Sequence, residues 1–329
     1  MKEKIKAPTM KDVAKEAGVA LGTVSKVFNG IPVGDEYRQK VEEAAKRLGY
    51  QVNEYARGLR AQKTYTIALI VPVIAHPFFS ELADSCCQIL QKKDYRMMIA
   101  TTYYDSGSEQ RCIDMVQQNK VDGIIAITYD PNLEVSDNLP FVIIDRKLDA
   151  NVPCVSSDNF FGGQLAAQKL LENGCKKLLF LSTGSDVAGE ADKRLIGFES
   201  YCMQHQVSYS KFKTNDSEGM LPLAKYIEDH ITDGAFEYDG IFCNTDVIAN
   251  MAVEKLKSMG LSIPDDVQII GYDGVKKQGT DEYLCSTIKQ PLYKMAETAV
   301  NLLLDVDKKD SPALVCLPVE YCYGGTTKK

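Results

Sequence analysis

The sequence predicts an α/β protein with a small all-α head, followed by a body of two lobes that are each built on a doubly wound parallel sheet. Two observations predict this organisation. The first fifty residues carry three short helical patterns and no strand-like run. From Thr66 onward, continuous apolar runs alternate with amphipathic stretches, which is typical of parallel strands covered by helices on both faces. A chain of 329 residues is long enough for two or three folding units.

Three short helices are expected in the head. The first begins at Thr9, which has capping-box spacing with Asp12, and ends at Gly18. The second carries apolar side chains at i, i+3 and i+4 on one face: Val24, Val27 and Phe28. The third begins with two acidic residues near its positive end and stops at Gly49, and its inward side chains are Val41, Ala44, Ala45 and Leu48. The tight turn "EAGVAL" between the first two helices is a helix-turn-helix signature.

Seven apolar runs of the body are expected to be strands: "TIALIVP", "RMMIATT", "DGIIAIT", "FVIID", "KLLFLST", "GIFCNT" and "VQIIGYD". Amphipathic stretches between them predict helices over Phe78 to Gln91, Phe160 to Glu172 and Val247 to Met259. Seven or more strands over about 260 residues fit two lobes better than one sheet. In such sheets ligands bind beyond the carboxyl ends of the strands. Polar residues recur at these ends, as a small polar ligand would require.

The charge of the chain is divided unevenly between head and body. Residues 1–63 hold 13 Lys and Arg against 8 Asp and Glu, a net charge of +5, while the remainder holds 25 against 37, a net charge of −12. A basic head on an acidic body indicates an anionic partner that binds at the head. A merely solvated basic end is the alternative, and charge alone does not separate the two.

The cysteines and the N-terminal residues indicate in which cellular compartment the protein is expected. None of the ten cysteines forms a C-x-x-C motif and the three histidines stand apart, so no zinc site is expected. Most of the cysteines lie in apolar runs and are expected to be buried free thiols, which predicts a reducing compartment, the cytoplasm. The chain has no apolar run of about eighteen residues and no apolar stretch behind its charged start, so neither a membrane span nor a secretory signal is expected.

Head, linker and body together resemble the lactose-repressor family of bacterial transcription regulators. The resemblance rests on "TMKDVAKEAGVALGTVSKVFNG", "VEEAAKRLGYQVNEYARGLRAQKT", "HPFF", "DNFFGG", "RLIGF" and "IIGYDG...TIKQP", in the order of the family. It covers nearly the whole chain. The body resembles the periplasmic-binding-protein fold, and the fold class expected is therefore a helix-turn-helix head on a body of that type.

The resemblance implies a DNA-reading second helix in the head. It assigns Leu21, Gly22 and Lys26 to base edges in the major groove, and assigns phosphate contacts to Thr9, Thr23, Ser25 and Asn29. Lys26 is long enough to reach a guanine, whereas Leu21 offers only an apolar contact and Gly22 only close approach. Ala20 stands where the family usually has a capping Ser, and a lost cap costs a helix about 1 kcal/mol. Part of the specificity is therefore expected from elsewhere.

The resemblance implies that residues 52–65 fold into a hinge helix in the minor groove. Leu59 stands at the position that is wedged into the central base step, with Asn53, Ala56, Arg57 and Arg60 around it. Val52 replaces the usual Pro. A plain flexible tether is the alternative, but a tether has no need of Leu59 at helical spacing from Ala56.

The resemblance also implies an effector site between the lobes. Family bodies bind sugars, purines or, in catabolite control, a phosphocarrier protein. The residues at the motif positions are His76, Phe78, Asp145, Arg146, Asp158, Arg194, Thr245, Asp246, Asp273 and Gln290. Their chemistry suits a polyol, because carboxylates accept from hydroxyls, Arg donates in a fork and an aromatic ring covers C–H groups. Two alternatives stay open: Asp246 could cap the following helix, and Phe78 could be a core residue. His76 replaces the family's common Asn.

The domains expected are a head of residues 1–51, a hinge and linker of 52–65 and a body of 66–329. The first lobe would comprise about 66–158 and 290–318, and the second about 159–289 and 319–329. Paired hinge helices on a palindromic site require a two-fold dimer. The C-terminal stretch lacks the leucine heptads that build the family's tetramers, so a homodimer is expected.

The function expected is sequence-specific transcriptional regulation, as a repressor of double-stranded palindromic operator DNA controlled by a sugar or related polar metabolite. No catalytic residue, metal or cofactor is expected, because no nucleophile–base pair, metal cluster or phosphate loop is found and "NFFGGQ" lacks nucleotide-fingerprint spacing. The alternatives are a solute-binding protein or an enzyme without DNA binding. A protein corepressor stays open, although no motif indicates one.

Overall fold

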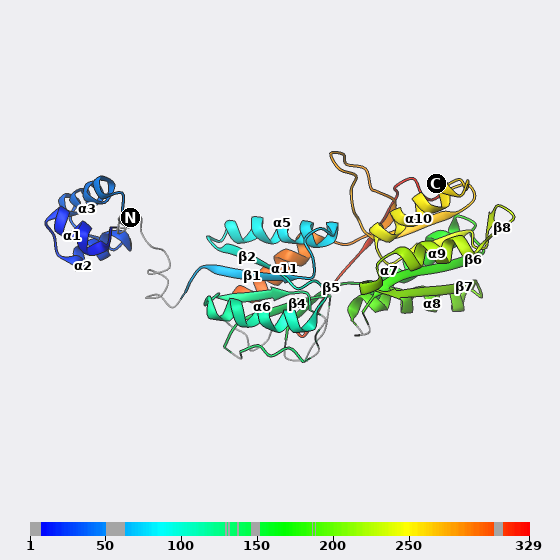
Figure 1. The fold of residues 1–329 in the computed structure, drawn as a ribbon, viewed down its shortest axis with the longest axis horizontal. Helices are drawn as coiled ribbons and strands as arrows, with labels where there is room; N and C mark the ends of the chain where they lie inside the picture. Colours follow the sequence, from blue (N-terminus) through cyan, green and yellow to red (C-terminus); the bar gives the residue numbers. More distant parts are fainter. Residues whose placement is uncertain are drawn as a thin grey trace, which may run out of the picture. The chain divides into compact units, whose positions relative to one another are not determined.

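The structure is a computed structural model that describes residues 8–50, 63–128, 130, 132–136, 138–145, 152–185, 187, 189–305 and 312–329. The chain divides into two compact units, Met1–Tyr65 and Thr66–Lys329 (Figure 1). The α/β fold class expected from the sequence is confirmed. No helix in the described part of the chain is long and apolar enough to cross a membrane.

The described residues of the first unit form three helices, α1 Met10–Ala17, α2 Leu21–Phe28 and α3 Asp35–Leu48, as the sequence predicts. Thr9 and Asp12 form the predicted capping box at α1, and α1 and α3 each end at a glycine with left-handed backbone. The helices share a small core, whose fully buried side chains include Val13, Val24 and Val41. At α2, the capping position is held by Ala20, which makes no side-chain hydrogen bond there.

The first lobe of the second unit is a six-stranded parallel sheet in the order β13-β5-β4-β3-β1-β2. Its strands are β1 Thr66–Val71, β2 Arg96–Thr101, β3 Gly123–Ala126, β4 Phe141–Ile144, β5 Cys154–Ser157 and β13 Leu314–Leu317. Helices α5 Pro77–Gln91 and α11 Leu292–Leu304 pack together over one face, and α6 Ser106–Gln118 covers the other (Figure 1). The carboxyl ends of its strands supply one wall of a cleft between the two lobes.

The second lobe is a six-stranded sheet in the order β14-β12-β11-β10-β6-β7, in which only β14 is antiparallel. Its strands are β6 Lys177–Gly184, β7 Ser208–Asn215, β10 Gly240–Cys243, β11 Gln268–Asp273, β12 Ser286–Lys289 and β14 Glu320–Cys322. Helices α7 Asn159–Glu172 and α8 Lys193–Gln204 cover one face, and α9 Leu221–Asp229 and α10 Asp246–Ser258 the other. Short 3-10 turns, Glu190–Asp192 and Asp216–Glu218, and a small hairpin of β8 Ile231–Thr232 and β9 Ala235–Phe236 complete this lobe.

The chain passes between the two sheets three times. It leaves the first sheet after β5, returns after β12 to form α11, and leaves again after β13 to form β14. All three crossings join strands at the same end of each sheet order, so β2 and β7 lie at the far edges from the crossings. This arrangement gives the cleft between the lobes a closed end at the crossings and an open end at β2 and β7.

Candidate functional site

A cavity of about 310 Å³ lies between the two lobes of the second unit. Residues from the carboxyl ends of strands in both sheets line it, as expected for doubly wound sheets. The sequence-predicted residues that line it are His76, Phe78, Asp145, Arg194, Thr245, Asp273 and Gln290. No group of three or more His, Cys, Asp or Glu side chains that could hold a metal ion is found in the part of the chain that the structure describes.

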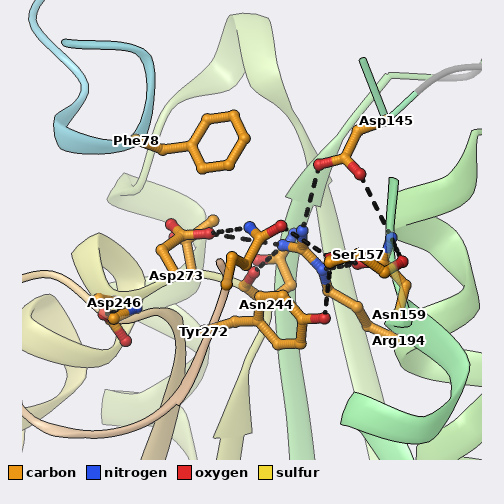
Figure 2. Close-up of polar contacts among 12 residues, drawn as sticks. Phe78, Asp145, Ser157, Asn159, Arg194, Asn244, Asp246, Tyr272 and Asp273 are labelled. Atoms are coloured by element: carbon orange, nitrogen blue, oxygen red, sulfur yellow. Dashed lines mark hydrogen bonds and ion pairs between the residues drawn. The ribbon is translucent and has the colours of Figure 1, made fainter. Parts of the chain in front are cut away.

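Arg194 occupies the centre of this site (Figure 2). It lies on α8, is almost fully buried, and its guanidinium carbon is 3.8 Å from the centroid of the Tyr272 ring. Its Nε donates to Oδ1 of Asn159 at 2.7 Å, and its Nη1 donates to the backbone oxygen of Asn244 at 2.6 Å. These contacts fix the guanidinium between two carboxylates, because Nη2 is 3.9 Å from Oδ2 of Asp145 and Nη1 is 4.0 Å from Oδ1 of Asp273.

The position of Arg194 depends on the close packing of α7 against α8. A Cβ at Gly163 would fall 2.0 Å from the backbone oxygen of Arg194, and a Cβ at Gly197 would fall 1.9 Å from that of Phe160. Only glycine permits such an approach of two helix backbones. The glycines of "DNFFGG" and "RLIGF" therefore set the distance between α7 and α8.

Asp273 ends β11 with one carboxylate oxygen unpartnered. Its Oδ1 accepts from Nε2 of Gln290 at 2.8 Å, and the Gln290 oxygen in turn accepts from Oγ of Ser157 at 2.8 Å. Its Oδ2 is buried and has no hydrogen-bond partner among the described residues. Burial raises the pKa of Asp273 well above its usual value, against the lowering effect of Arg194. A buried oxygen without a partner is costly, so a donor from a ligand would stabilise this site.

The first lobe faces Asp273 with Asp145 and with an N-terminal helix end. Asp145 follows β4, adopts a left-handed backbone (φ 56°), and its Oδ1 accepts from Oγ of Ser156 at 2.8 Å. His76 caps α5, where its Nδ1 accepts from the backbone N–H of Phe78 at 3.3 Å. Burial, with a smaller effect of Arg194, lowers the pKa of His76 to about 4. At neutral pH the ring is therefore uncharged, with its proton on Nε2.

Phe78 satisfies both interpretations that the sequence left open. It belongs to the hydrophobic core of the first lobe, where its ring packs edge-on against Phe79 at 5.4 Å between centroids. It also lines the cavity, above the polar group around Arg194 (Figure 2). An aromatic face is thus available on the side of the cleft opposite the second lobe.

Two of the sequence-predicted residues lie outside the lining of the cavity. Asp158 caps α7, where its Oδ1 accepts from the backbone N–H of Phe161 at 3.0 Å. Asp246 is fully buried, and its Oδ2 accepts from the backbone N–H groups of Gly274 and Val275 at 2.9 and 2.6 Å. Asp246 does not cap α10, because the side chain of Thr245 does so. Arg146 lies outside the described residues.

Several lining residues are absent from the sequence-based set: Tyr104, Ser182, Thr183, Ser185, Asp192, Lys213, Asp216, Met220 and Asn244. Asn244 could have been found, because it directly follows the apolar run of β10. Lys213 and Asp216 lie on or just after β7, whose sequence "SYSKFKTN" lacks the apolar run of a buried strand. Asn244 matters most of these, because its buried side-chain oxygen has no hydrogen-bond partner among the described residues.

Six of the seven predicted DNA-facing residues of the head lie on or beside α2, and the seventh, Thr9, precedes α1. Leu21, Gly22 and Lys26 are exposed, and the Leu21 side chain is 41% exposed despite being apolar. Thr23 and Ser25 are half-buried, while the exposed Asn29 donates from Nδ2 to Oγ of Ser25 at 3.3 Å. Thr9 is exposed at the start of α1, and its hydroxyl donates to Asp12 at 2.7 Å. The hinge residues Asn53, Ala56, Arg57, Leu59 and Arg60 lie outside the described residues.

Comparisons with known proteins match both units. Residues 9–53 match the family described as bacterial regulatory proteins, lacI family, and residues 64–321 match the periplasmic binding proteins and sugar binding domain of LacI family. The sucrose operon repressor of Streptococcus mutans is 33% identical over 94% of this chain and 96% of its own length. The ribose operon repressor of Bacillus subtilis is 33% identical over 98% of this chain and 99% of its own length.

A solved structure of the Lac repressor dimer, bound to operator and an anti-inducer, shares the fold. Its TM-score is 0.82 at 20% identity, and the match covers 98% of this chain and all of that one.

Proposed function

Since the chain belongs to the lacI family of bacterial regulatory proteins, we propose that it represses transcription from a palindromic operator as a homodimer and that a small uncharged sugar in the cleft controls its operator affinity. The chain is a DNA-binding transcriptional regulator and not an enzyme. A protein that binds operator DNA works where the bacterial chromosome lies, so the cytoplasm is its proposed location.

The unpartnered Oδ2 of Asp273 is the observation that carries the sugar proposal. This oxygen is buried beside the cleft and can accept from a hydroxyl, as can the unpartnered side-chain oxygen of Asn244. Arg194 stands between them and Asp145 as a donor. Adjacent hydroxyl groups of a sugar both donate and accept, so they satisfy such a mixed set, while Phe78 covers the ring's C–H groups.

The charges of the cleft favour an uncharged ligand over a phosphorylated one. Its described lining contains four carboxyl groups against two cationic side chains, Arg194 and Lys213. Both cations lie close to carboxylates, since Nζ of Lys213 is 3.6 Å from Oδ1 of Asp192. A phosphate would meet these carboxylates at close range, and like charges destabilise such a complex.

For the operator, we assign base contacts in the major groove to Leu21, Gly22 and Lys26, and phosphate contacts to Thr9, Thr23, Ser25 and Asn29. An exposed apolar Leu21 at the start of α2 suits a thymine methyl group, and Lys26 one turn later suits a guanine. The remaining specificity is assigned to the hinge, with Leu59 as the minor-groove wedge and Asn53, Ala56 and Arg57 beside it. Two heads of a dimer would read the two half-sites of a palindrome.

Asp273→Ala tests the sugar half of this proposal. Removal of the carboxyl group, and with it the accepting Oδ2, should lower affinity for the sugar about 10- to 100-fold, because a hydrogen bond to a charged group is worth roughly 1.5–3 kcal/mol. Operator binding without sugar should persist, since the head forms a separate unit. Calorimetry with a panel of neutral sugars and fluorescence anisotropy with labelled operator measure the two affinities.

Asp281→Ala is the matched control, because this aspartate lies in the same lobe with its side chain fully exposed. Sugar affinity that is unchanged in folded Asp273→Ala would remove Asp273 from the site. Loss of operator binding together with sugar binding would show that Asp273 chiefly maintains the structure.

A further inference from the structure

The cleft is longer than the polar group at its closed end. That group, which we call the cleft floor, consists of Asp145, Arg194, Asp273 and Gln290. At the open end lie Tyr104, just after β2, and Met220, just beyond β7; with Lys213 and Asp216 they form what we call the cleft rim. Both ends line one continuous cavity of about 310 Å³.

The sheet orders give the distance between floor and rim. In the first lobe, β4 precedes Asp145 and is separated from β2 by β3 and β1; in the second, β11 is separated from β7 by β10 and β6. Each lobe therefore has three strand spacings between floor and rim. At about 4.8 Å each, this is roughly 14 Å. A single furanose or pyranose ring held at the floor would leave the rim unoccupied.

The rim presents apolar surface to solvent from both lobes. The side chains of Tyr104 and Met220 are 37% and 38% exposed while also lining the cavity. Tyr103 and Tyr104 both have left-handed backbone, with φ values of 53° and 62°. Bulky residues rarely adopt this conformation, and backbone strain of this kind clusters at ligand clamps. The strained turn after β2 directs one of its two tyrosines to the cleft.

We infer that the rim is a second sugar subsite and that the ligand has two linked rings, as in a disaccharide or a glycoside. The inference rests on the proposed function, because it takes the floor as the subsite of the first ring. Tyr104 and the thioether of Met220 would cover the C–H faces of the second ring from opposite sides. Lys213 and Asp216 would meet its hydroxyls as donor and acceptor.

The test compares sugars of one and two rings on the full-length dimer by calorimetry. The probes are sucrose, maltose, trehalose, cellobiose and lactose, together with glucose, fructose, galactose and ribose. We expect at least one disaccharide to bind about tenfold or more tightly than either of its component monosaccharides. Tyr104→Asn should remove most of that advantage and leave affinity for the monosaccharide within about twofold.

Asn is chosen because it tolerates the left-handed backbone and preserves the turn. Tyr103→Asn is the matched control, since Tyr103 has the same backbone conformation, is 74% exposed and does not line the cavity. It should leave all affinities unchanged. Equal effects of the two variants would overturn the second subsite.

The outcomes separate this inference from the proposed function. If a monosaccharide binds as tightly as every disaccharide, and Asp273→Ala weakens it, the proposed function stands and the second subsite falls. If Tyr104→Asn weakens one-ring and two-ring sugars equally, Tyr104 belongs to the floor and the second subsite also falls. If no sugar of the panel binds the wild type, both proposals fail.

Discussion

Asp246 and Asp273 are two buried aspartates that stand side by side in the fold and have different roles. Asp273 turns one oxygen to the cleft, whereas both oxygens of Asp246 serve the structure. Asp246 holds the backbone amides of Gly274 and Val275, and its Oδ1 accepts from the thiol of Cys285 at 3.3 Å. Those amides directly follow Asp273, whose backbone has a positive φ of 121°. Asp246 therefore stabilises the strained turn that presents Asp273.

Asp246→Asn should change how the stability of the body depends on pH. Burial raises the pKa of Asp246 from its usual 3.8 to about 7 in the folded chain. Folding therefore takes up a proton between these values, so this carboxyl's contribution to stability is complete below about pH 4 and is lost as pH rises through 7. Asparagine does not titrate. The free energy of unfolding, measured in urea, should favour the wild type over the variant more at pH 5 than at pH 8.

Titrating groups that do not interact with Asp246 cancel in the difference, whereas Asp273, whose pKa the charge of Asp246 raises, contributes to it. A difference in unfolding free energy that is the same at pH 5 and pH 8 would show that Asp246 is ionised throughout this range.

At the scale of the elements, the head helices and the strands within long apolar runs could be predicted, whereas the shorter or more polar strands could not. Seven strands and the three head helices were expected from apolar runs, helical periodicity and caps, and all are confirmed, whereas β5, β12, β13 and β14 were not among the expected strands. β7 was not predicted, because it is an edge strand and most of its side chains are partly or fully exposed. The rim residues near the ends of β2 and β7 were not predicted to line the cleft either. Their place in the cleft depends on which strands form the sheet edges.

The polar lining of the cleft was predictable to a similar extent and for a related reason. Polar residues after buried strands were expected to face a ligand, and Asp145, Thr245 and Asp273 do line the cavity. Asp158 and Asp246 follow strands as well, but their side chains are taken up by backbone amides. Sequence position places a residue at a strand end, whereas the direction of its side chain depends on which backbone groups need a partner.

The packing of α7 against α8 gives a prediction at this scale. Gly163→Ala places a Cβ 2.0 Å from the backbone oxygen of Arg194, so the helices must separate. Overpacking of this kind costs roughly 1–3 kcal/mol, which thermal unfolding of the full chain should detect. Sugar affinity should fall as well, because Arg194 lies on the helix that moves.

Gly107→Ala is the control, since this helical glycine on α6 has its nearest neighbour 3.6 Å from the added Cβ. Its stability should be unchanged or slightly higher, because alanine favours helix. Equal effects of the two substitutions would mean that the α7–α8 contact tolerates a methyl group.

At the scale of the whole molecule, the two ligands differ in charge as the two parts of the chain do. Residues 1–63 carry a net charge of +5 and the remainder carries −12. DNA is therefore attracted to the positive head and repelled by the negative body. An uncharged sugar is neither attracted nor repelled by these net charges. The sugar can therefore change operator affinity only through a change in conformation that both ligands favour or disfavour. This coupling is reciprocal, so operator DNA changes the affinity for the sugar by the same factor.

Salt should separate the two binding events. Operator affinity of the dimer should fall by about 10³- to 10⁵-fold between roughly 50 and 200 mM salt if six to ten phosphates are contacted, because each contact releases counterions. Affinity for the sugar, measured by calorimetry over the same range, should change less than about twofold, since no ion is released when a neutral ligand binds. An operator curve that is flat with salt would contradict phosphate contacts by the head. A sugar curve that falls with salt would show a charged ligand, and the four carboxyl groups of the cleft would then require a cationic sugar, such as an amino sugar, in place of a neutral one.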